Sequence, residues 1–170
     1  GIMHLSMAFL EEGDEVLVPN PGYPAYAVCS RIAGATVRTF DLCPENGYKP
    51  DLEVLQNTDL SKVKMMWINY PNMPTGAVVD STFFERIVHF GAKNQILICH
   101  DNPYTFILND SPSSILQTSD AFPWALELTS LSKNYNMAGW RVGALAADQT
   151  IIQQVLKFKS NMDSGMYKAI

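Results

Sequence analysis

The sequence has little positive charge and no cluster of it. Its 170 residues include 12 Lys and Arg against 17 Asp and Glu, which gives a formal net charge of −5. Proteins that bind nucleic acids must neutralise many phosphates with Lys and Arg, so this balance argues against a nucleic-acid partner. Because 47% of the residues are hydrophobic and only 17% are charged, the chain can still bury a core. At this length we expect one domain.

Long apolar runs and paired cysteines are also missing. No apolar run approaches the roughly 18 residues that a membrane-spanning helix needs, and the first residues lack the pattern of a secretory signal. The three cysteines, Cys29, Cys43 and Cys99, are odd in number and have no Cys-x-x-Cys spacing, which is typical of reduced thiols. We therefore expect a cytoplasmic protein that does not enter a membrane.

Both ends of the sequence suggest an internal piece of a longer protein. Helical apolar periodicity begins directly after Gly1, without a capping residue before it. A further helix is expected to begin near Asp163 and Ser164, and the sequence then ends at Ile170 without a stop signal.

Apolar runs that favour strands alternate with segments of helical periodicity, the pattern of an α/β protein with a mostly parallel sheet. Thr82 to Glu85 fits a capping box at the start of one helix, and Pro50 opens a short helix that ends at Leu55. The expected strands cover residues 15–18, 36–40, 64–69, 95–100, 125–129 and 142–146. Besides the short helix, the expected helices cover residues 2–11, 24–33, 82–93 and 149–159, and the capping box opens the third of these.

Three of the expected strands are followed by unusual sets of polar residues. The first set is Asn69 to Gly76, which reads Asn-Tyr-Pro-Asn-Met-Pro-Thr-Gly, and the second is His100 to Tyr104. The third is Ser-Leu-Ser-Lys over Ser130 to Lys133, followed by Gly-Trp-Arg-Val-Gly over Gly139 to Gly143. Ligands of open α/β sheets bind outside the carboxyl ends of the strands, so the three sets predict one site.

These residues resemble the class I and II aminotransferases, enzymes of fold type I that use pyridoxal 5′-phosphate (PLP). That family carries an Asn-Pro-Thr-Gly-type loop, an Asp-x-x-Tyr at a strand end, and the pattern Ser-x-Ser-Lys-x-x-x-x-x-Gly-x-Arg-x-Gly. The last pattern is matched at every fixed position from Ser130 to Gly143. The resemblance covers essentially the whole chain and is closest to the LL-diaminopimelate aminotransferase group.

The resemblance implies a fold and a place within it. The fold would be a three-layer αβα sandwich with a mostly parallel sheet. Residues 1–170 would form the central part of the PLP-binding large domain, with an N-terminal segment and a small C-terminal domain lying outside them. The intact enzyme would be a homodimer with active sites at the subunit interface, and the 170 residues alone would bind PLP weakly and not turn over.

The resemblance also implies roles for the polar residues. Lys133 would react with the aldehyde of PLP, which requires a lysine kept nucleophilic by partial desolvation near other cations. A buried carboxylate keeps the pyridine nitrogen of PLP protonated, and Asp101 would take that role. Tyr104 would donate a hydrogen bond to the phenolate oxygen of the cofactor.

Four further residues are assigned by the same resemblance. Arg141 and Ser130 would bind the phosphate, with Ser132 as a weaker phosphate or orienting contact. Tyr23 would stack on the pyridine ring, whereas Tyr26 is expected to pack in the core.

One position departs from the family pattern. The family has an asparagine directly before Pro-Thr-Gly that contacts the phenolate oxygen, but here that position is Met73, and Asn72 comes one residue earlier. A shift of one residue turns a side chain elsewhere unless the geometry at Pro71 and Pro74 compensates. Asn72 is therefore retained as a weaker cofactor contact, which would leave Tyr104 to do that work alone.

The implied function is transfer of an amino group between an amino acid and a 2-oxo acid. A PLP-dependent carbon–sulfur lyase remains an alternative, because one fold supports several PLP reactions. A PLP-sensing regulatory module without catalysis is another. The histidines His4, His89 and His100 lack metal-ligand spacing, so no metal site is expected. A buried histidine near a strand end is expected to make structural hydrogen bonds.

Overall fold

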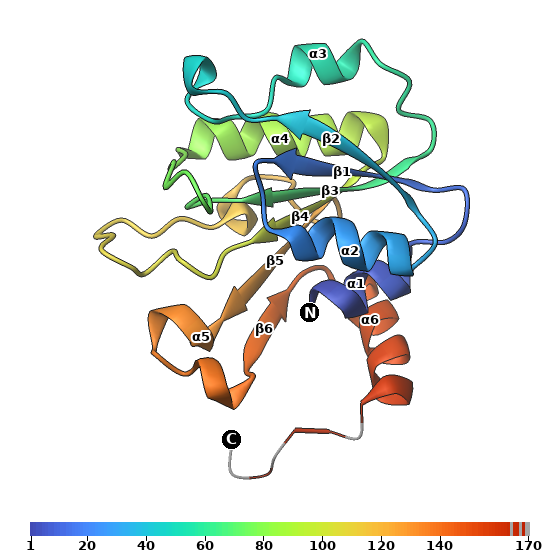
Figure 1. Ribbon diagram of the computed structural model, residues 1–170, viewed down its shortest axis with the longest axis vertical. Helices are drawn as coiled ribbons and strands as arrows, with labels where there is room; N and C mark the ends of the chain where they lie inside the picture. The colour runs from blue at the N-terminus through green and yellow to red at the C-terminus, as the bar shows by residue number, and fades with distance from the viewer. Residues whose placement is uncertain (164, 167, 169–170) are drawn as a thin grey trace.

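The computed structural model describes residues 1–163, 165, 166 and 168. Their strands form one sheet in the order β2-β1-β3-β4-β5-β6 (Figure 1). The first five strands in that order are parallel, and β6 is antiparallel to β5. The strands are β1 (Glu15–Asn20), β2 (Thr36–Asp41), β3 (Val63–Asn69), β4 (Leu97–Asp101), β5 (Ala125–Ser130) and β6 (Gly143–Ala146).

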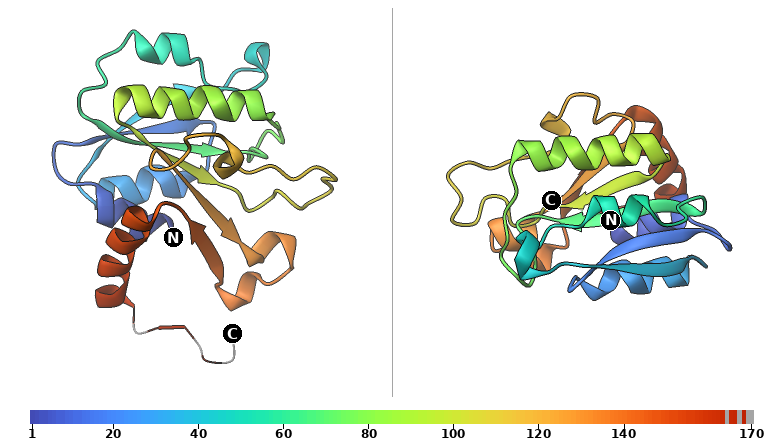
Figure 2. Two further views of the ribbon diagram at one scale, coloured as in Figure 1. Left: turned by 180° about the vertical axis from the view of Figure 1, so that it is seen from behind. Right: turned by 90° about the horizontal axis from the view of Figure 1, so that it is seen from above.

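Helices cover both faces of this sheet, which confirms the three-layer αβα arrangement. Helix α4 lies on one face and α2 on the other, as the view from above shows (Figure 2). The α-helices are α1 (Ile2–Phe9), α2 (Pro24–Ile32), α3 (Leu52–Gln56), α4 (Ser81–Asn94), α5 (Leu131–Asn134) and α6 (Gln149–Met162). Single 3-10 turns are η1 (Pro44–Asn46), η2 (Ile115–Gln117) and η3 (Ala138–Trp140).

The central strand β3 is buried on both faces, which is why it appears in the sequence as a continuous apolar run. Met66 and Ile68 pack in the core beneath α3 and α4. Met65 and Trp67 pack in the opposite core, beneath α1, α2 and α6. Successive residues of a strand point to opposite faces, so one strand supplies both cores. None of the helices in the described part of the chain is long and apolar enough to cross a membrane.

The expected elements are found, but several of their ends differ. The predicted capping box from Thr82 to Glu85 is wrong: α4 begins one residue earlier, and the carboxylate of Asp80 accepts the backbone N–H of Phe83 at 2.9 Å. Strand β4 begins at Leu97 rather than at residue 95, because Gln95 takes a left-handed conformation with φ 57° that ends α4.

The C-terminal expectation falls partly outside the described residues. Helix α6 ends at Met162, and Asp163 follows it in an extended conformation as its C-cap. The expected start of a new helix at Ser164 lies outside the residues that the structure describes.

The capping arrangement of α4 gives a direct test. We expect Asp80→Ala to lower the free energy of unfolding by about 1 kcal/mol, because the N–H of Phe83 loses its side-chain acceptor. The matched control Thr82→Ala removes a side chain that does not cap the helix and should change stability by less than about 0.5 kcal/mol. Urea unfolding of both variants measures the difference, and equal effects would show that Asp80 is not the cap.

Candidate active site

The polar sets predicted from the sequence meet at one edge of the sheet. Strands β3, β4 and β5 are parallel neighbours, so Asn69, Asp101 and Ser130 all lie at their carboxyl ends (Figure 1). The strand order reverses between β1 and β3, next to these ends, because the chain passes from β1 outward to β2 and then back across to β3. Such a reversal leaves a crevice between the loops, which is where open α/β sheets bind ligands.

Asp101 is held by a hydrogen bond from a distant tyrosine. The hydroxyl of Tyr26 in α2 donates to Oδ2 of Asp101 at 2.7 Å. Tyr26 is only 1% exposed, and its ring stacks on Trp67 with centroids 4.9 Å apart and planes 9° apart. Tyr26 therefore packs in the core as expected, but it also positions Asp101, a role that the sequence analysis missed.

The environment of Asp101 acts on its charge in two directions. Burial raises the pKa of Asp101 above its ordinary value, while the hydrogen bond from Tyr26 and the charge of His100 act to lower it. Burial and the neighbouring Asp101 carboxylate also raise the pKa of Tyr26, so this phenol remains a hydrogen-bond donor at neutral pH. The result is a largely buried carboxyl group whose Oδ2 already accepts one fixed hydrogen bond.

Two more tyrosines stand beside this carboxylate. Tyr23 is 46% exposed at the N-cap of α2, and its ring meets that of Tyr26 edge to face, with centroids 5.7 Å apart. Tyr104 follows β4, and burial raises its pKa, with further contributions from the charge of Asp101 and from Tyr23. The structure thus brings Tyr23, Asp101 and Tyr104 together, and the exposed ring of Tyr23 is free to stack on a planar ligand.

The loop after β3 is held by its own asparagines. Asn69 donates from Nδ2 to the backbone oxygen of Asp101 at 2.8 Å, and its Oδ1 accepts the N–H of Met73 at 2.8 Å. Asn72 is 4% exposed. Its Oδ1 accepts from the hydroxyl of Thr75 at 2.7 Å, and its Nδ2 donates to the backbone oxygen of Asn69 at 3.2 Å. The amide of Asn72 therefore stabilises the loop, and its predicted contact with a cofactor stays a prediction.

The loop after β3 contains two prolines that follow cis peptide bonds. The peptide bonds before Pro71 and Pro74 are both cis, as is the bond before Pro21 in the loop after β1. All three bonds lie at the edge of the sheet where Asp101 is found.

The lysine and its neighbours follow β5. The hydroxyl of Ser130 caps α5 by accepting the N–H of Ser132 at 3.2 Å. Lys133 lies on the same short helix with its side chain exposed, so its amine is accessible. The serines therefore shape the turn that carries the lysine, and their predicted phosphate contacts stay predictions.

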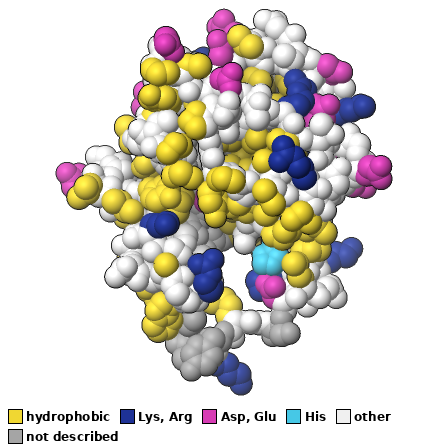
Figure 3. Space-filling model, in the orientation of Figure 1, with side chains coloured by type: hydrophobic (Ala, Val, Ile, Leu, Met, Phe, Trp, Pro, Cys, Tyr) yellow, Lys and Arg dark blue, Asp and Glu magenta, His cyan; other side chains and the backbone are white. Residues whose placement is uncertain are grey.

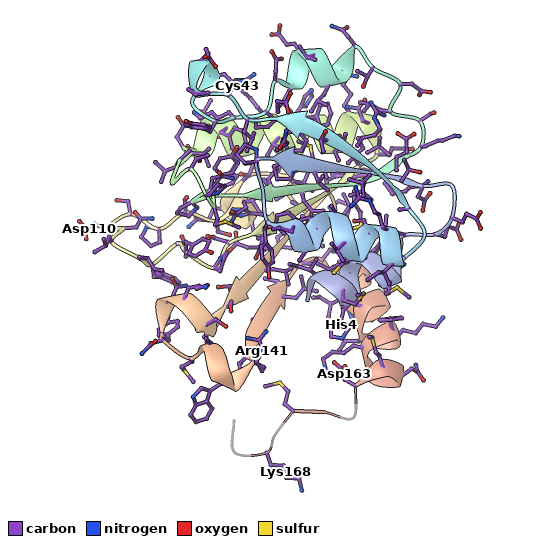
Figure 4. All side chains as sticks on the ribbon, in the orientation of Figure 1. His4, Cys43, Asp110, Arg141, Asp163 and Lys168 are labelled. Carbon is purple, nitrogen blue, oxygen red and sulfur yellow. The ribbon has the colours of Figure 1, made fainter. Side chains whose placement is uncertain are left out.

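Arg141 lies between η3 and β6, directly after η3. Its backbone is left-handed, with φ 56°, and its Nη1 donates to the backbone oxygen of Ala138 at 2.9 Å. A Cβ on Gly143 would come 2.6 Å from the backbone oxygen of Thr129, so only glycine lets β6 pair this closely with β5. The surface is hollowed beside β6 (Figure 3), with Arg141 on one side and the His4–Asp163 pair on the other (Figure 4).

The comparisons with known proteins agree with this geometry. The family model for aminotransferase class I and II matches residues 1–166. The chain is 46% identical to an LL-diaminopimelate aminotransferase of Dehalococcoides mccartyi over 100% of its length and 44% of that relative. It is also 46% identical to the LL-diaminopimelate aminotransferase of Gloeobacter violaceus, over 96% of its length and 42% of the relative.

Solved structures give the same result. The apo-BacF structure from Bacillus subtilis superposes with a TM-score of 0.94 at 40% identity, covering 99% of this chain and 43% of that one. Aspartate aminotransferase from Thermotoga maritima superposes with a TM-score of 0.90 at 31% identity, covering 98% of this chain and 45% of that one. The chain spans less than half the length of the relatives it matches. It belongs to the class I and II aminotransferase family.

Proposed function

We propose that the complete protein carrying this chain is a PLP-dependent aminotransferase that moves an amino group between an amino acid and a 2-oxo acid. The observation that carries the proposal is the Asp101 carboxylate, held by Tyr26 at the edge of the sheet where Lys133 and Arg141 also lie. The relatives are named as aminotransferases, and nothing in their names favours a carbon–sulfur lyase or a regulatory module.

The residues present suit PLP. PLP offers a pyridine nitrogen, a phenolate oxygen, an aldehyde and a phosphate. When bound, it joins covalently to amines and accepts the electron pair released at the α-carbon of an amino acid. The chain provides a carboxylate, a phenol, a primary amine and a guanidinium for these four groups, in the form of Asp101, Tyr104, Lys133 and Arg141.

Each of these side chains has a defined task. Asp101 would accept a hydrogen bond from the protonated pyridine nitrogen, while its Oδ2 is held by the hydroxyl of Tyr26. Tyr104 would donate to the phenolate oxygen. The amine of Lys133 would bind the cofactor through its aldehyde group and would serve as the general base and acid that moves the α-proton of the substrate.

The remaining contacts bind and orient. The guanidinium of Arg141 would bind the phosphate through two N–H groups, with the hydroxyls of Ser130 and Ser132 beside it. Tyr23 would stack on the pyridine ring, and Asn72 would act through the loop after β3. We propose no metal for this reaction.

We also propose the setting of the chain. Residues 1–170 would form the central part of the PLP-binding large domain, and the complete protein would be a cytoplasmic homodimer. The three free cysteines support a reducing compartment. Exposed aromatic side chains next to the site, Tyr135 at 57% and Trp140 at 51%, support a partner surface there.

Lys133 gives the first test of the function. We expect the complete protein to bind PLP with a visible absorption band, and borohydride to fix a pyridoxyl group on the Lys133 peptide. Lys133→Ala should lose this label and lower transamination by about 10²–10⁴-fold or more, because the variant lacks the amine that carries the proton. Lys157→Ala, in α6 and exposed, is the control. Labelling of Lys133→Ala to the wild-type level would contradict the assignment.

Arg141 can be separated from the other contacts by its ligand. We expect Arg141→Ala to weaken PLP binding by about 10- to 100-fold, the loss that follows removal of charge-assisted hydrogen bonds. Binding of pyridoxal, which has no phosphate, should stay close to that of the wild type. Titration of the visible band with each compound measures both affinities, and an equal loss for both would rule out the phosphate role.

Asp101 gives a pH-dependent test. Because burial raises its pKa, the folded state binds the proton more tightly than the unfolded state, so its contribution to stability falls as pH rises through the folded pKa. We expect Asp101→Asn to raise the free energy of unfolding of the cofactor-free protein by about 0.5–2 kcal/mol at pH 7. The gain should vanish below about pH 4, where wild-type Asp101 is also neutral.

Urea unfolding across pH measures this effect, and PLP binding should weaken in the same variant. The control is Asp110→Asn, at the exposed tip of the loop after β4 (Figure 4), which should change stability by less than about 0.5 kcal/mol. A stability gain in Asp101→Asn that persists at pH 3 would show that charge is not its cause.

A further inference from the structure

His100, the residue before Asp101, is completely buried, and both of its ring nitrogens face hydrogen-bond acceptors. Nδ1 lies 3.0 Å from Oε2 of Glu127 on β5, and Nε2 lies 3.0 Å from the backbone oxygen of Tyr70. A carbonyl oxygen can only accept hydrogen bonds, and the same is true of an ionised carboxylate. Both ring nitrogens must then carry a hydrogen, which is the imidazolium form.

Glu127 has the environment of an ionised carboxylate. Burial by itself would raise its pKa, but the hydrogen bond and charge of His100, with hydrogen bonds from Ser114 and Ile115, bring the pKa below its ordinary value. The backbone N–H of Ile115 donates to the same Oε2 at 3.2 Å. The side chains of His100 and Glu127 are 0% and 15% exposed, so solvent screens this ion pair little.

This pair connects four segments around the proposed cofactor pocket. The register of β4 and β5 places His100 opposite Glu127, while Tyr70 begins the loop after β3 and Ile115 begins η2. On its other side, His100 meets the ring of Phe84 from α4, with centroids 5.1 Å apart. The pair therefore holds β3, β4, β5 and η2 together just below the loops of the site.

His100 and Asp101 point to opposite faces of the sheet, as neighbours on a strand do. Asp101 faces Tyr26 of α2, whereas His100 faces α4, yet the charge of His100 still acts to lower the pKa of Asp101. The titratable groups nearest to His100 are thus Glu127 from β5, Asp101 from β4 itself and Tyr70, which follows β3. The hydroxyl of Tyr70 donates to the backbone oxygen of Tyr48. Helix α4 presents an uncharged ring.

We propose that His100 is a buried imidazolium that acts as a positioning residue: hydrogen-bonded to Glu127 and to the backbone oxygen of Tyr70, it holds the loop after β3 in place and sets a positive charge next to Asp101. The proposal deepens the proposed function and rests on it for the role of Asp101. A buried ion pair adds little net stability, because the lost hydration offsets the attraction. We therefore attribute the His100–Glu127 pair to its position next to the site rather than to a gain in stability.

The charge of His100 can be measured directly. In the complete protein without cofactor, ¹⁵N signals of the His100 ring, assigned through backbone connectivity to Asp101, should show both nitrogens protonated at pH 7. A single unprotonated nitrogen would overturn the proposal. This measurement needs no variant, so it decides the charge even if substitutions at the pair prevent folding.

The effect on Asp101 requires the isosteric change Glu127→Gln. Removing the carboxylate should convert His100 to the neutral imidazole, shift the ¹³C titration of the Asp101 carboxyl to higher pH and raise the PLP dissociation constant about fivefold or more. The matched control is Glu15→Gln at the opposite end of the sheet, which breaks a pair with Arg38 at 2.8 Å. It should leave both readouts unchanged.

The two proposals fail in different ways. If Glu127→Gln neutralises His100 but Asp101 titrates at the same pH as in the control Glu15→Gln, the positioning role is overturned. If the wild-type complete protein does not bind PLP, the proposed function is overturned. The charge of His100 and its effect on Asp101 are still decided then, because both NMR measurements are made without cofactor.

Discussion

A carboxylate loses its hydration when it is buried, and the arrangement around β4 offsets part of this cost for Asp101. Tyr26 reaches the carboxylate because α2 packs on the sheet and stacks its tyrosine on Trp67. On the opposite face, Glu127 holds His100 next to the same residue. Helix α2 and strands β3, β4 and β5 thus all contribute to the surroundings of the Asp101 carboxylate, and the polar loops follow these strands.

Much of the fold could be predicted from the sequence, because parallel strands buried on both faces leave continuous apolar runs such as that of β3. The ends of elements were harder to predict. Asp80 and Thr82 are both residue types that cap helices, so residue type alone does not distinguish them, and the structure uses Asp80. Likewise, nothing in the residue type of Gln95 announces the left-handed conformation that delays β4.

The candidate site was predictable where its residues follow strands. Asp101, Ser130 and the residues after them lie at strand ends in the sequence and in the structure. The supporting contacts were not predictable, because they join residues far apart in the chain: Tyr26 and Asp101 are separated by 75 positions, and His100 and Glu127 by 27. Such pairs have no local pattern, although two tyrosines three residues apart at a helix start are a signal that could have identified Tyr26.

The spread of the site along the chain has a consequence for protein synthesis. Its residues run from Tyr23 before α2 to Arg141 before β6, and parallel strands pair only after the helix between them has been made. A growing chain on the ribosome can therefore shape the loop after β1 early but cannot complete the pocket until β6 has emerged and paired with β5. Until then Arg141 is not held at this edge of the sheet, so a ligand that needs its guanidinium has to wait for β6.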